Sequence, residues 1–221
     1  MSSLLLTAAA LAAAAAPAPA DFTTRIDNPY WPMKPGSRWV YRETDSEGAR
    51  QRVVVTVTRR TKLIANGVTA RVVHDVVTED GKPVEVTDDW YAQDRAGNIW
   101  YLGEDTTEYE DGRPVSKEGS FEAGVDGARP GMIMPAHPRV GMRYRQEYYK
   151  GHAEDRAKVI TLDAQVNVPY GRFDDALETE DTAPLGAGSV EHKYYARGVG
   201  LVLARSAGGE REELLSFRRG R

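Results

Sequence analysis

Short motifs that occur twice, in the same order and at nearly constant spacing, most limit what this chain can fold into. Two strand-like motifs recur 104 to 105 residues apart, namely WYA at 90–92 with YYA at 194–196, and VVVTV at 53–57 with KVITL at 158–162. Three glycines recur at offsets of 103 to 105 residues, namely Gly36 with Gly141, Gly67 with Gly171, and Gly97 with Gly200. Ordered matches with so little drift indicate that residues 34–111 have been copied as residues 139–217.

The pattern inside each copy is that of short antiparallel strands. Val53, Val55 and Val57 alternate with other residues, which is the period of a β-strand. Hairpin turns are indicated by dipeptides that tolerate positive φ, namely Asn66-Gly67, Asp80-Gly81 and Asp111-Gly112. We therefore expect an all-β fold with mainly antiparallel pairing. The duplicated meander would form either a sandwich or a curved half-barrel, with pseudo-twofold symmetry.

The two copies should belong to one domain. A single meander buries too little apolar surface to be stable alone, whereas two packed copies share one core. The segment between them, residues 112–136, is rich in glycine and proline and is expected to be a crossing loop. Residues 21–221 are therefore predicted to form a single β domain built from two similar halves.

The first twenty residues have the features of an export signal. Leu4 to Ala16 is an apolar run too short to span a bilayer, and Ala18-Pro19-Ala20 offers a cleavage site before Asp21. No lysine or arginine precedes the run, which departs from the usual signal. We expect a secreted protein, or one in the periplasm or on the exterior of the cell envelope, with no stable membrane insertion after signal removal.

The two ends of the mature chain carry motifs that resemble a known group. NPYWPMKPGSRWVYRE near the start and EHKYYARGVGLVLAR near the end are similar to sequences in exported bacterial β-rich proteins of unassigned function. The shared features are a Pro-x-Lys-x-Gly-x-x-Trp-x-Tyr opening and a Tyr-Ala-x-Gly-Val-Gly-Leu-Val closing strand. The resemblance implies an exported β-rich fold and transfers no catalytic residue.

Composition and motifs argue against several functions. A net charge of −4 gives no reason to expect nucleic-acid binding, and the absence of cysteine excludes disulfides, thiolate metal sites and a lipid-modified cysteine. The chain has no His-x-x-x-His zinc motif, no phosphate-binding glycine motif and no Gly-x-Ser-x-Gly nucleophile setting. We expect no cofactor, no metal-ligating residue and no catalytic residue, and a protein that is not an enzyme.

Acidic clusters are the one feature that suits a cation. They occur at 103–112, 173–181 and 209–214, and oxygen-rich clusters are chemically suited to calcium. None has the spacing of an EF-hand loop. The interpretation we favour is that these carboxylates form solvated faces of strands.

Aromatic residues in the repeated strands are the candidate binding residues. In pairs such as Trp90-Tyr91, one ring must lie on each face of the sheet. The candidate binding residues are Trp90, Trp100, His192, Tyr194 and Asp89.

The repeat also pairs charged positions. His192 takes the place of Asp88, and Lys193 takes the place of Asp89. If the halves pack about a pseudo-twofold axis, the two carboxylates would face these two bases. This predicts either a salt-bridged seam between the halves or a polar site.

The function these observations favour is non-catalytic binding. We expect a ligand-binding or envelope-associated module whose partner is a small molecule, a glycan or an envelope component. One alternative is an extracellular hydrolase acting on carbohydrate or peptide, using Asp88 or Asp89 with His192. Another is a lipid carrier with a cupped sheet, although strands such as TTEYEDG and VEHKYY are polar for a lipid cavity.

Overall fold

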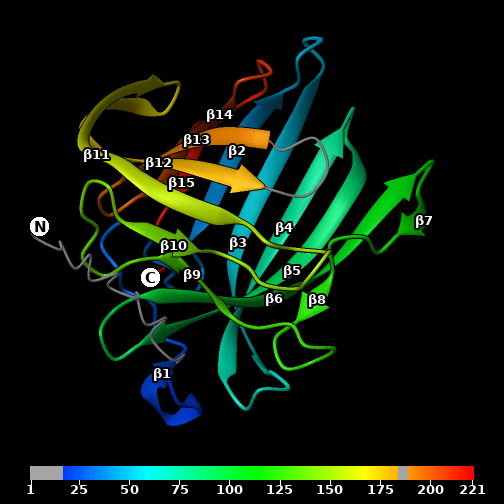
Figure 1. Ribbon diagram of the computed structural model, residues 1–221. Helices are drawn as coiled ribbons and strands as arrows, with labels where there is room; N and C mark the ends of the chain where they lie inside the picture. The colour runs from blue at the N-terminus through cyan, green and yellow to red at the C-terminus, as the bar shows by residue number, and fades with distance from the viewer. Residues whose placement is uncertain (1–16, 184–188) are drawn as a thin grey trace, which may run out of the picture.

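The fold is all-β, as predicted, and takes the form of one large curved sheet (Figure 1). The computed structural model describes residues 17–183 and 189–221, so most of the predicted export signal lies outside the described residues. Within those ranges the chain contains one turn of 3₁₀ helix, Pro19–Asp21, and no α-helix. No helix in the described part of the chain is both long and apolar enough to cross a bilayer.

Each half of the chain contributes six strands in the same order. The first half contains β2 (Arg38–Thr44), β3 (Arg50–Leu63), β4 (Thr69–Glu79), β5 (Lys82–Asp94), β6 (Ile99–Glu110) and β7 (Arg113–Ser116). The second half contains β10 (Arg143–Arg145), β11 (Arg156–Val168), β12 (Gly171–Ala183), β13 (Ser189–Ala196), β14 (Gly200–Ser206) and β15 (Arg211–Arg218). Superposition of the two halves stays a prediction.

The two halves join edge to edge. The strand order is β10-β11-β12-β13-β14-β15-β2-β3-β4-β5-β6-β7, and every pairing is antiparallel. The last strand of the chain, β15, therefore pairs with β2, the first long strand, with Leu214 opposite Tyr41. The sheet is not closed, because β10 and β7 end it on opposite sides. This is the curved half-barrel of the two predicted arrangements.

The segment between the halves is more structured than the predicted crossing loop. After β7, the last strand of the first half, it contains β8 (Phe121–Glu122) and β9 (Gly131–Met134), and all three strands pair with β6. The short strand β1 (Phe22–Thr23) pairs with β5. The segment thus extends the sheet beside β6 before the chain crosses to the second half.

The main core lies on one face of the sheet, here called the inner face, which carries Trp39, Tyr41, Val53, Val73 and Tyr91. These residues are at most 8% exposed and form one cluster with residues of the second half. A smaller cluster on the opposite, outer face includes Trp90 and Leu102, with Phe22 packed against it. Because neighbouring side chains on a strand point to opposite faces, Trp90 and Tyr91 enter different cores.

A β-bulge at Gly103 places Glu104, as well as Tyr101, on the inner face of the sheet. Tyr101 pairs with Tyr91 and Glu104 pairs with Asp89, so one extra residue stands on β6 between these pairs. Gly103 has a φ of 120°, and a Cβ there would lie 2.1 Å from the Phe121 carbonyl oxygen. Glycine is required because a side chain would meet both backbone strain and the neighbouring strand.

Replacing Gly103 should therefore cost more than replacing a turn glycine. We expect Gly103→Ala to lower the free energy of unfolding by about 2–4 kcal/mol, because strain and a backbone clash add. Gly112, which has a φ of 74° and open space around its Cβ, is the matched control. Gly112→Ala should cost about 1 kcal/mol. Urea denaturation measures both, and equal losses would contradict the role given to the bulge.

Candidate ligand-binding cavity

A cavity of about 200 Å³ is set into the inner face, with walls from both halves of the chain. Its lining has three kinds of side chain. The aromatic residues are Trp31, Trp39, Tyr41 and Tyr91, the carboxylates are Asp75, Asp89 and Glu212, and the apolar residues are Met33, Val55, Val57, Val73 and Leu201. An apolar enclosure with a few convergent polar groups is typical of a small-molecule site.

The aromatic walls are fixed by β14. The Trp39 indole Nε1 donates a hydrogen bond of 2.7 Å to the Val199 carbonyl, and the Tyr41 hydroxyl donates one of 3.0 Å to the Leu201 carbonyl. Gly200 lies between these carbonyls with a φ of 107°, and a Cβ there would lie 3.2 Å from the Trp31 ring. The absence of a side chain at Gly200 lets the two indoles pack against this strand.

Trp31 comes from the segment that leads into β2. Its ring lies 5.8 Å from the Tyr91 ring and 5.5 Å from the Tyr195 ring, measured between centroids. The segment is anchored at the buried Asn28, whose side-chain amide donates to the carbonyls of Gly97 at 3.0 Å and Pro135 at 3.2 Å. These bonds hold Trp31 over the inner face, where it contacts rings from both halves.

The three carboxylates of the cavity are only partly satisfied. Asp89 accepts a hydrogen bond of 2.7 Å from the Tyr101 hydroxyl. Asp75 Oδ1 is shielded from solvent and has no hydrogen-bond partner among residues 17–183 and 189–221. In the described part of the chain, neither residue forms a salt bridge, and Glu212 forms none either. A buried acceptor without a partner costs free energy unless a ligand or water supplies the donor.

Burial and like charge raise the pKa of each of these carboxyl groups. Burial raises the pKa of Asp75 to about 6, with Glu85 contributing. Burial, together with Asp75 and Glu43, raises the pKa of Glu212 to about 8. Burial and Glu104 hold the pKa of Asp89 well above its ordinary value. The pKa of Glu212 therefore lies above neutral pH, and the pKa of Asp75 lies just below it.

The acidic character extends beyond the cavity along the inner face. Burial and Asp155 raise the pKa of Glu147 to about 8, and burial raises the pKa of Glu104. The charge of Lys193 opposes the rise in the pKa of Glu147 and Glu212, and its ammonium lies 3.4 Å from Asp181 and 3.2 Å from Glu191. Lys193 is thus already paired with carboxylates outside the cavity.

Asp89 is the sequence-predicted binding residue that lines the cavity. Trp90 and Trp100 do not. Trp90 is packed in the outer core, with the Lys62 ammonium 4.1 Å from its ring centroid. The Trp100 indole donates a hydrogen bond of 2.8 Å to Asp94 and meets the Phe22 ring edge-on. Both indoles stabilise the outer side of the sheet near β1.

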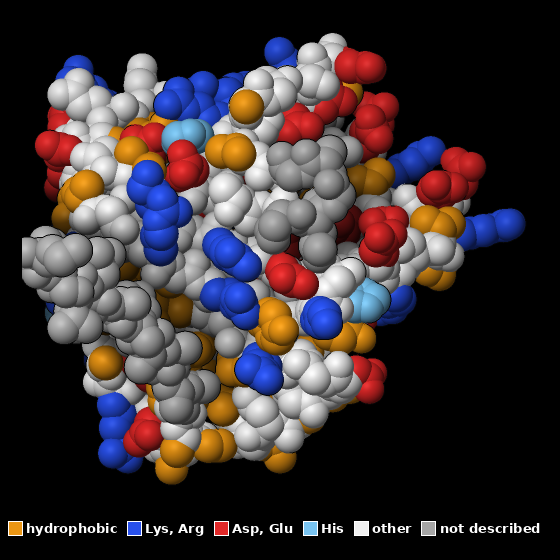
Figure 2. Space-filling view, viewed as in Figure 1, with side chains coloured by type: hydrophobic (Ala, Val, Ile, Leu, Met, Phe, Trp, Pro, Cys, Tyr) orange, Lys and Arg blue, Asp and Glu red, His pale blue; other side chains and the backbone are white. Residues whose placement is uncertain are grey.

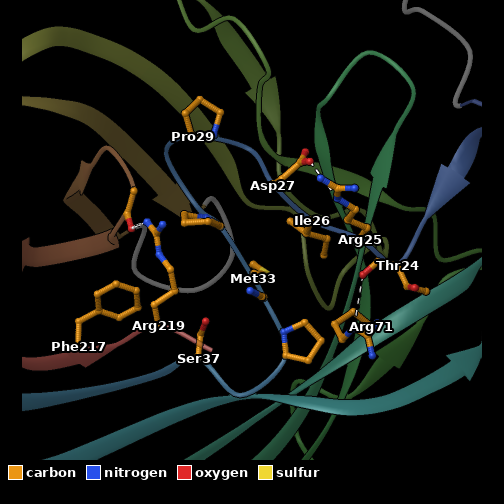
Figure 3. A pocket seen from close by; sticks show the side chains of 14 residues that line it. Thr24, Arg25, Ile26, Asp27, Pro29, Met33, Ser37, Arg71, Phe217 and Arg219 are labelled. Atoms are coloured by element: carbon orange, nitrogen blue, oxygen red, sulfur yellow. Dashed lines mark hydrogen bonds and ion pairs between the residues drawn. The ribbon is translucent and has the colours of Figure 1, made fainter. Parts of the chain in front are cut away.

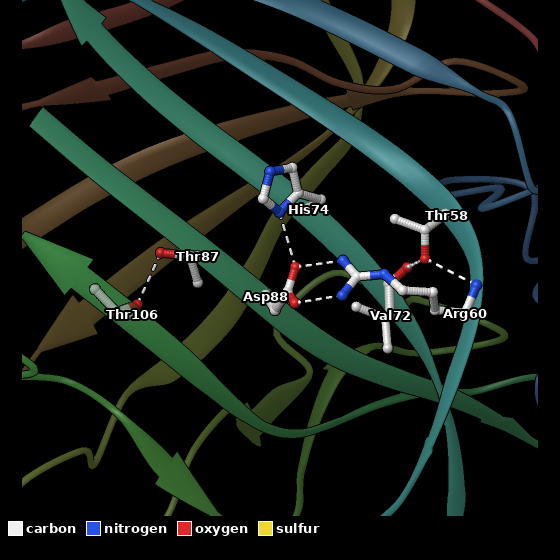
Figure 4. A network of polar contacts seen from close by, with 7 residues as sticks. All are labelled: Thr58, Arg60, Val72, His74, Thr87, Asp88 and Thr106. Carbon is white, nitrogen blue, oxygen red and sulfur yellow. Dashed lines mark hydrogen bonds and ion pairs between the residues drawn. The ribbon is translucent and has the colours of Figure 1, made fainter. Parts of the chain in front are cut away.

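His192 and Tyr194 lie together, away from the cavity lining. Both contact Glu178, with His192 Nδ1 2.8 Å and the Tyr194 hydroxyl 3.0 Å from its Oε1 atom. Asp88, by contrast, bonds His74 at 2.8 Å and both terminal nitrogens of Arg60 (Figure 4). The predicted pairing of Asp88 and Asp89 with His192 and Lys193 is therefore wrong.

The reason for this error lies in the strand order. Asp88 and Asp89 are on β5, His192 and Lys193 are on β13, and β14, β15, β2, β3 and β4 lie between them. His74 and His192 instead each pair with an acid of their own half. Glu178 follows His74 by 104 residues and His192 follows Asp88 by 104 residues, so the acid and the base have exchanged places between the copies.

A second, larger cavity of about 750 Å³ lies beside residues 24–37, the segment that leads into β2 (Figure 3). Its apolar lining includes Ile26, Met33 and Phe217. Three arginines also line it: Arg25 pairs with Asp27 at 3.2 Å, Arg71 donates to the Arg59 carbonyl at 3.0 Å, and Arg219 donates to the Gly198 carbonyl at 2.7 Å. Lys and Arg side chains also gather across the middle of the face seen in Figure 2. This cavity was not foreseen from the sequence, although part of its lining, from Pro29 to Ser37, lies in the NPYWPMKPGSRWVYRE segment.

Comparison with known proteins adds little to this site. No protein-family model matches the chain, and no curated protein matches it. A solved structure from Parabacteroides distasonis, described as a candidate lipoprotein, is similar with a TM-score of 0.46 and 12% identity. The match covers 86% of this chain and 98% of that one. A likeness at this level assigns neither fold nor function.

The carboxyl pKa values predict how stability depends on pH. The folded state holds the Glu212 proton up to about pH 8, whereas the unfolded chain releases it near the ordinary value of 4.5. The folded state thus binds more protons across this window, and the free energy of unfolding falls as pH rises through it. We expect Glu212→Gln to flatten this fall and to raise the melting temperature at pH 8.5.

Glu213→Gln is the matched control for that experiment. Glu213 is the next residue on β15, points to the opposite face, and has a lowered pKa beside Arg42 and Arg211. The Glu213→Gln variant should leave the slope of the free energy of unfolding against pH unchanged between pH 5 and 8.5. Calorimetric melting curves across this range test both variants. An unaltered slope in Glu212→Gln would contradict the burial of this carboxyl group.

Proposed function

We propose that this protein is an exported, non-catalytic binding protein that holds a small molecule in the inner-face cavity. The observation that carries the proposal is the cavity itself, which combines four aromatic rings with three carboxylates that have no cation partner in the described chain. One of their oxygens, Asp75 Oδ1, is shielded from solvent and lacks a donor among the described residues, and a bound ligand would supply one. Residues 1–20 support export to the periplasm or cell surface, where an envelope component is a further candidate partner.

The hydrolase alternative loses its predicted residues. It required Asp88 or Asp89 beside His192, and these residues lie on β5 and β13, with five strands between them. His192 contacts Glu178 instead. Asp88 in turn contacts His74, so the pairing of Asp88 or Asp89 with His192 that this alternative predicted does not form.

A second candidate function is a carrier of anionic amphiphiles. The observation that favours it is the larger cavity, in which apolar residues such as Phe217 lie beside the guanidinium groups of Arg71 and Arg219. Such walls suit an apolar chain with an acidic headgroup. The carboxylates of the inner face do not suit it, so the two candidates require different cavities.

Native mass spectrometry of protein purified from its own host tests the proposal. We expect an extra mass that disappears on unfolding. Val73→Phe, which fills the inner-face cavity at a cost of about 1–3 kcal/mol, should abolish the extra mass, whereas Arg219→Gln should retain it. Circular dichroism establishes that each variant is folded.

Retention of the extra mass in Val73→Phe and its loss in Arg219→Gln would assign the ligand to the larger cavity and favour the amphiphile carrier. A wild-type protein that carries no extra mass, and that binds no member of a small-molecule library, would contradict both binding functions.

A further inference from the structure

The charged groups that line the inner-face cavity determine whether it favours a positively or a negatively charged ligand. Asp75, Asp89 and Glu212 all line it, and none of them forms a salt bridge in the described part of the chain. Asp75 Oδ1 is shielded from solvent without a hydrogen-bond donor among the described residues. The Lys193 ammonium is held by Asp181 and Glu191. A ligand that brings a positive charge would stabilise the ionised form of these groups, whereas an anion would favour their neutral form.

The aromatic walls select the chemical type of that cation. Trp31, Trp39, Tyr41 and Tyr91 all line the cavity. The indole nitrogen of Trp39 and the hydroxyl of Tyr41 are already bonded to carbonyls of β14, so these two residues offer the ligand mainly their rings. Aromatic rings attract organic cations through the negative charge of their faces, and cages of rings with acids bind alkylammonium groups.

The same walls disfavour a hard metal ion. Calcium takes about six to eight oxygen ligands, and the cavity offers three carboxylates among aromatic and aliphatic side chains. No group of acids and histidines among the described residues has a geometry that could hold a metal ion. The volume of about 200 Å³ corresponds to about seven water molecules, which limits the ligand to a small one.

We propose that the inner-face cavity binds a small organic cation, an alkylammonium or quaternary ammonium compound, between its aromatic rings and the carboxylates of Asp75 and Glu212. This inference rests on the proposed function, because it names the ligand class of the same cavity. The positive charge lies near the two carboxylates, and the alkyl groups contact Trp31, Trp39 and Tyr41. The cavity thereby recognises charge and shape together.

Isothermal titration at low salt and pH 8.5 tests this inference with a matched pair of probes. Choline and 3,3-dimethyl-1-butanol have nearly the same shape, and only choline is charged. We expect choline to bind at least about tenfold more tightly than the alcohol, and calcium chloride to give no binding. Equal binding of choline and the alcohol, or binding of calcium in place of choline, would overturn the inference.

Variants place the binding in the cavity. Asp75→Asn and Glu212→Gln keep the shape of each side chain and remove its charge, so each should weaken choline binding about tenfold. Glu213→Gln removes a charge from the same strand on the opposite face and should leave the affinity within about twofold. An equal effect of Glu212→Gln and Glu213→Gln would show that net charge, not the cavity, attracts choline.

Proton release provides a readout independent of affinity. The Glu212 carboxyl faces Asp75, Glu43, Glu191 and Lys193, and it is largely protonated at pH 7. A cation that binds its charged form must expel that proton. The binding enthalpy at pH 7 should therefore differ between phosphate and Tris buffers in the wild type and much less in Glu212→Gln.

The two proposals fail in different ways. If neither choline nor methylammonium binds, the organic-cation inference is wrong. A neutral or anionic extra mass in the host-purified protein, lost in Val73→Phe, would support the proposed function and overturn this inference. Loss of a cationic extra mass in Val73→Phe, together with choline binding by the wild type, would support both.

Discussion

The pairing of β15 with β2 is the contact on which the inner face depends. It turns two meanders into one sheet and sets Leu214 opposite Tyr41 and Glu212 opposite Glu43. Like charges on directly opposed residues destabilise a strand pair, and here both side chains lie on the buried side of the junction. Without this junction, Glu212 would not lie beside Asp75, and the cavity would lose the wall that the second half provides.

The two halves share one order of antiparallel strands, and the differences between their side chains shape the cavity. The outer face keeps an acid–histidine pair in each half, with the two residue types exchanged between equivalent positions. The inner face differs: the first half offers Asp75 and Asp89, whereas the corresponding region of the second half holds Lys193 paired with Asp181. The first half therefore supplies two of the cavity's three carboxylates, Glu212 of the second half supplies the third, and Asp181 is paired with Lys193 outside the cavity.

Sequence reasoning recovered the strands because their signals are local. Alternating valines and turn glycines such as Gly67 mark hairpins without knowledge of the rest of the chain. The junction and the face of each residue are not local: the bulge at Gly103 moves Glu104 to the inner face, and the strand order separates Asp88 from His192. One signal could have indicated the cavity, since Asp75 interrupts the otherwise apolar alternation of Val73 and Val77.

A crystal structure of the protein purified from its own host at pH 8 tests the account most directly. The account predicts density for a small molecule in the inner-face cavity, with a nitrogen near Asp75 and Glu212 and alkyl groups against Trp31 and Tyr41. A cavity that holds only water, with ligand density instead beside Trp100 and His192 or between Arg71 and Arg219, would contradict it.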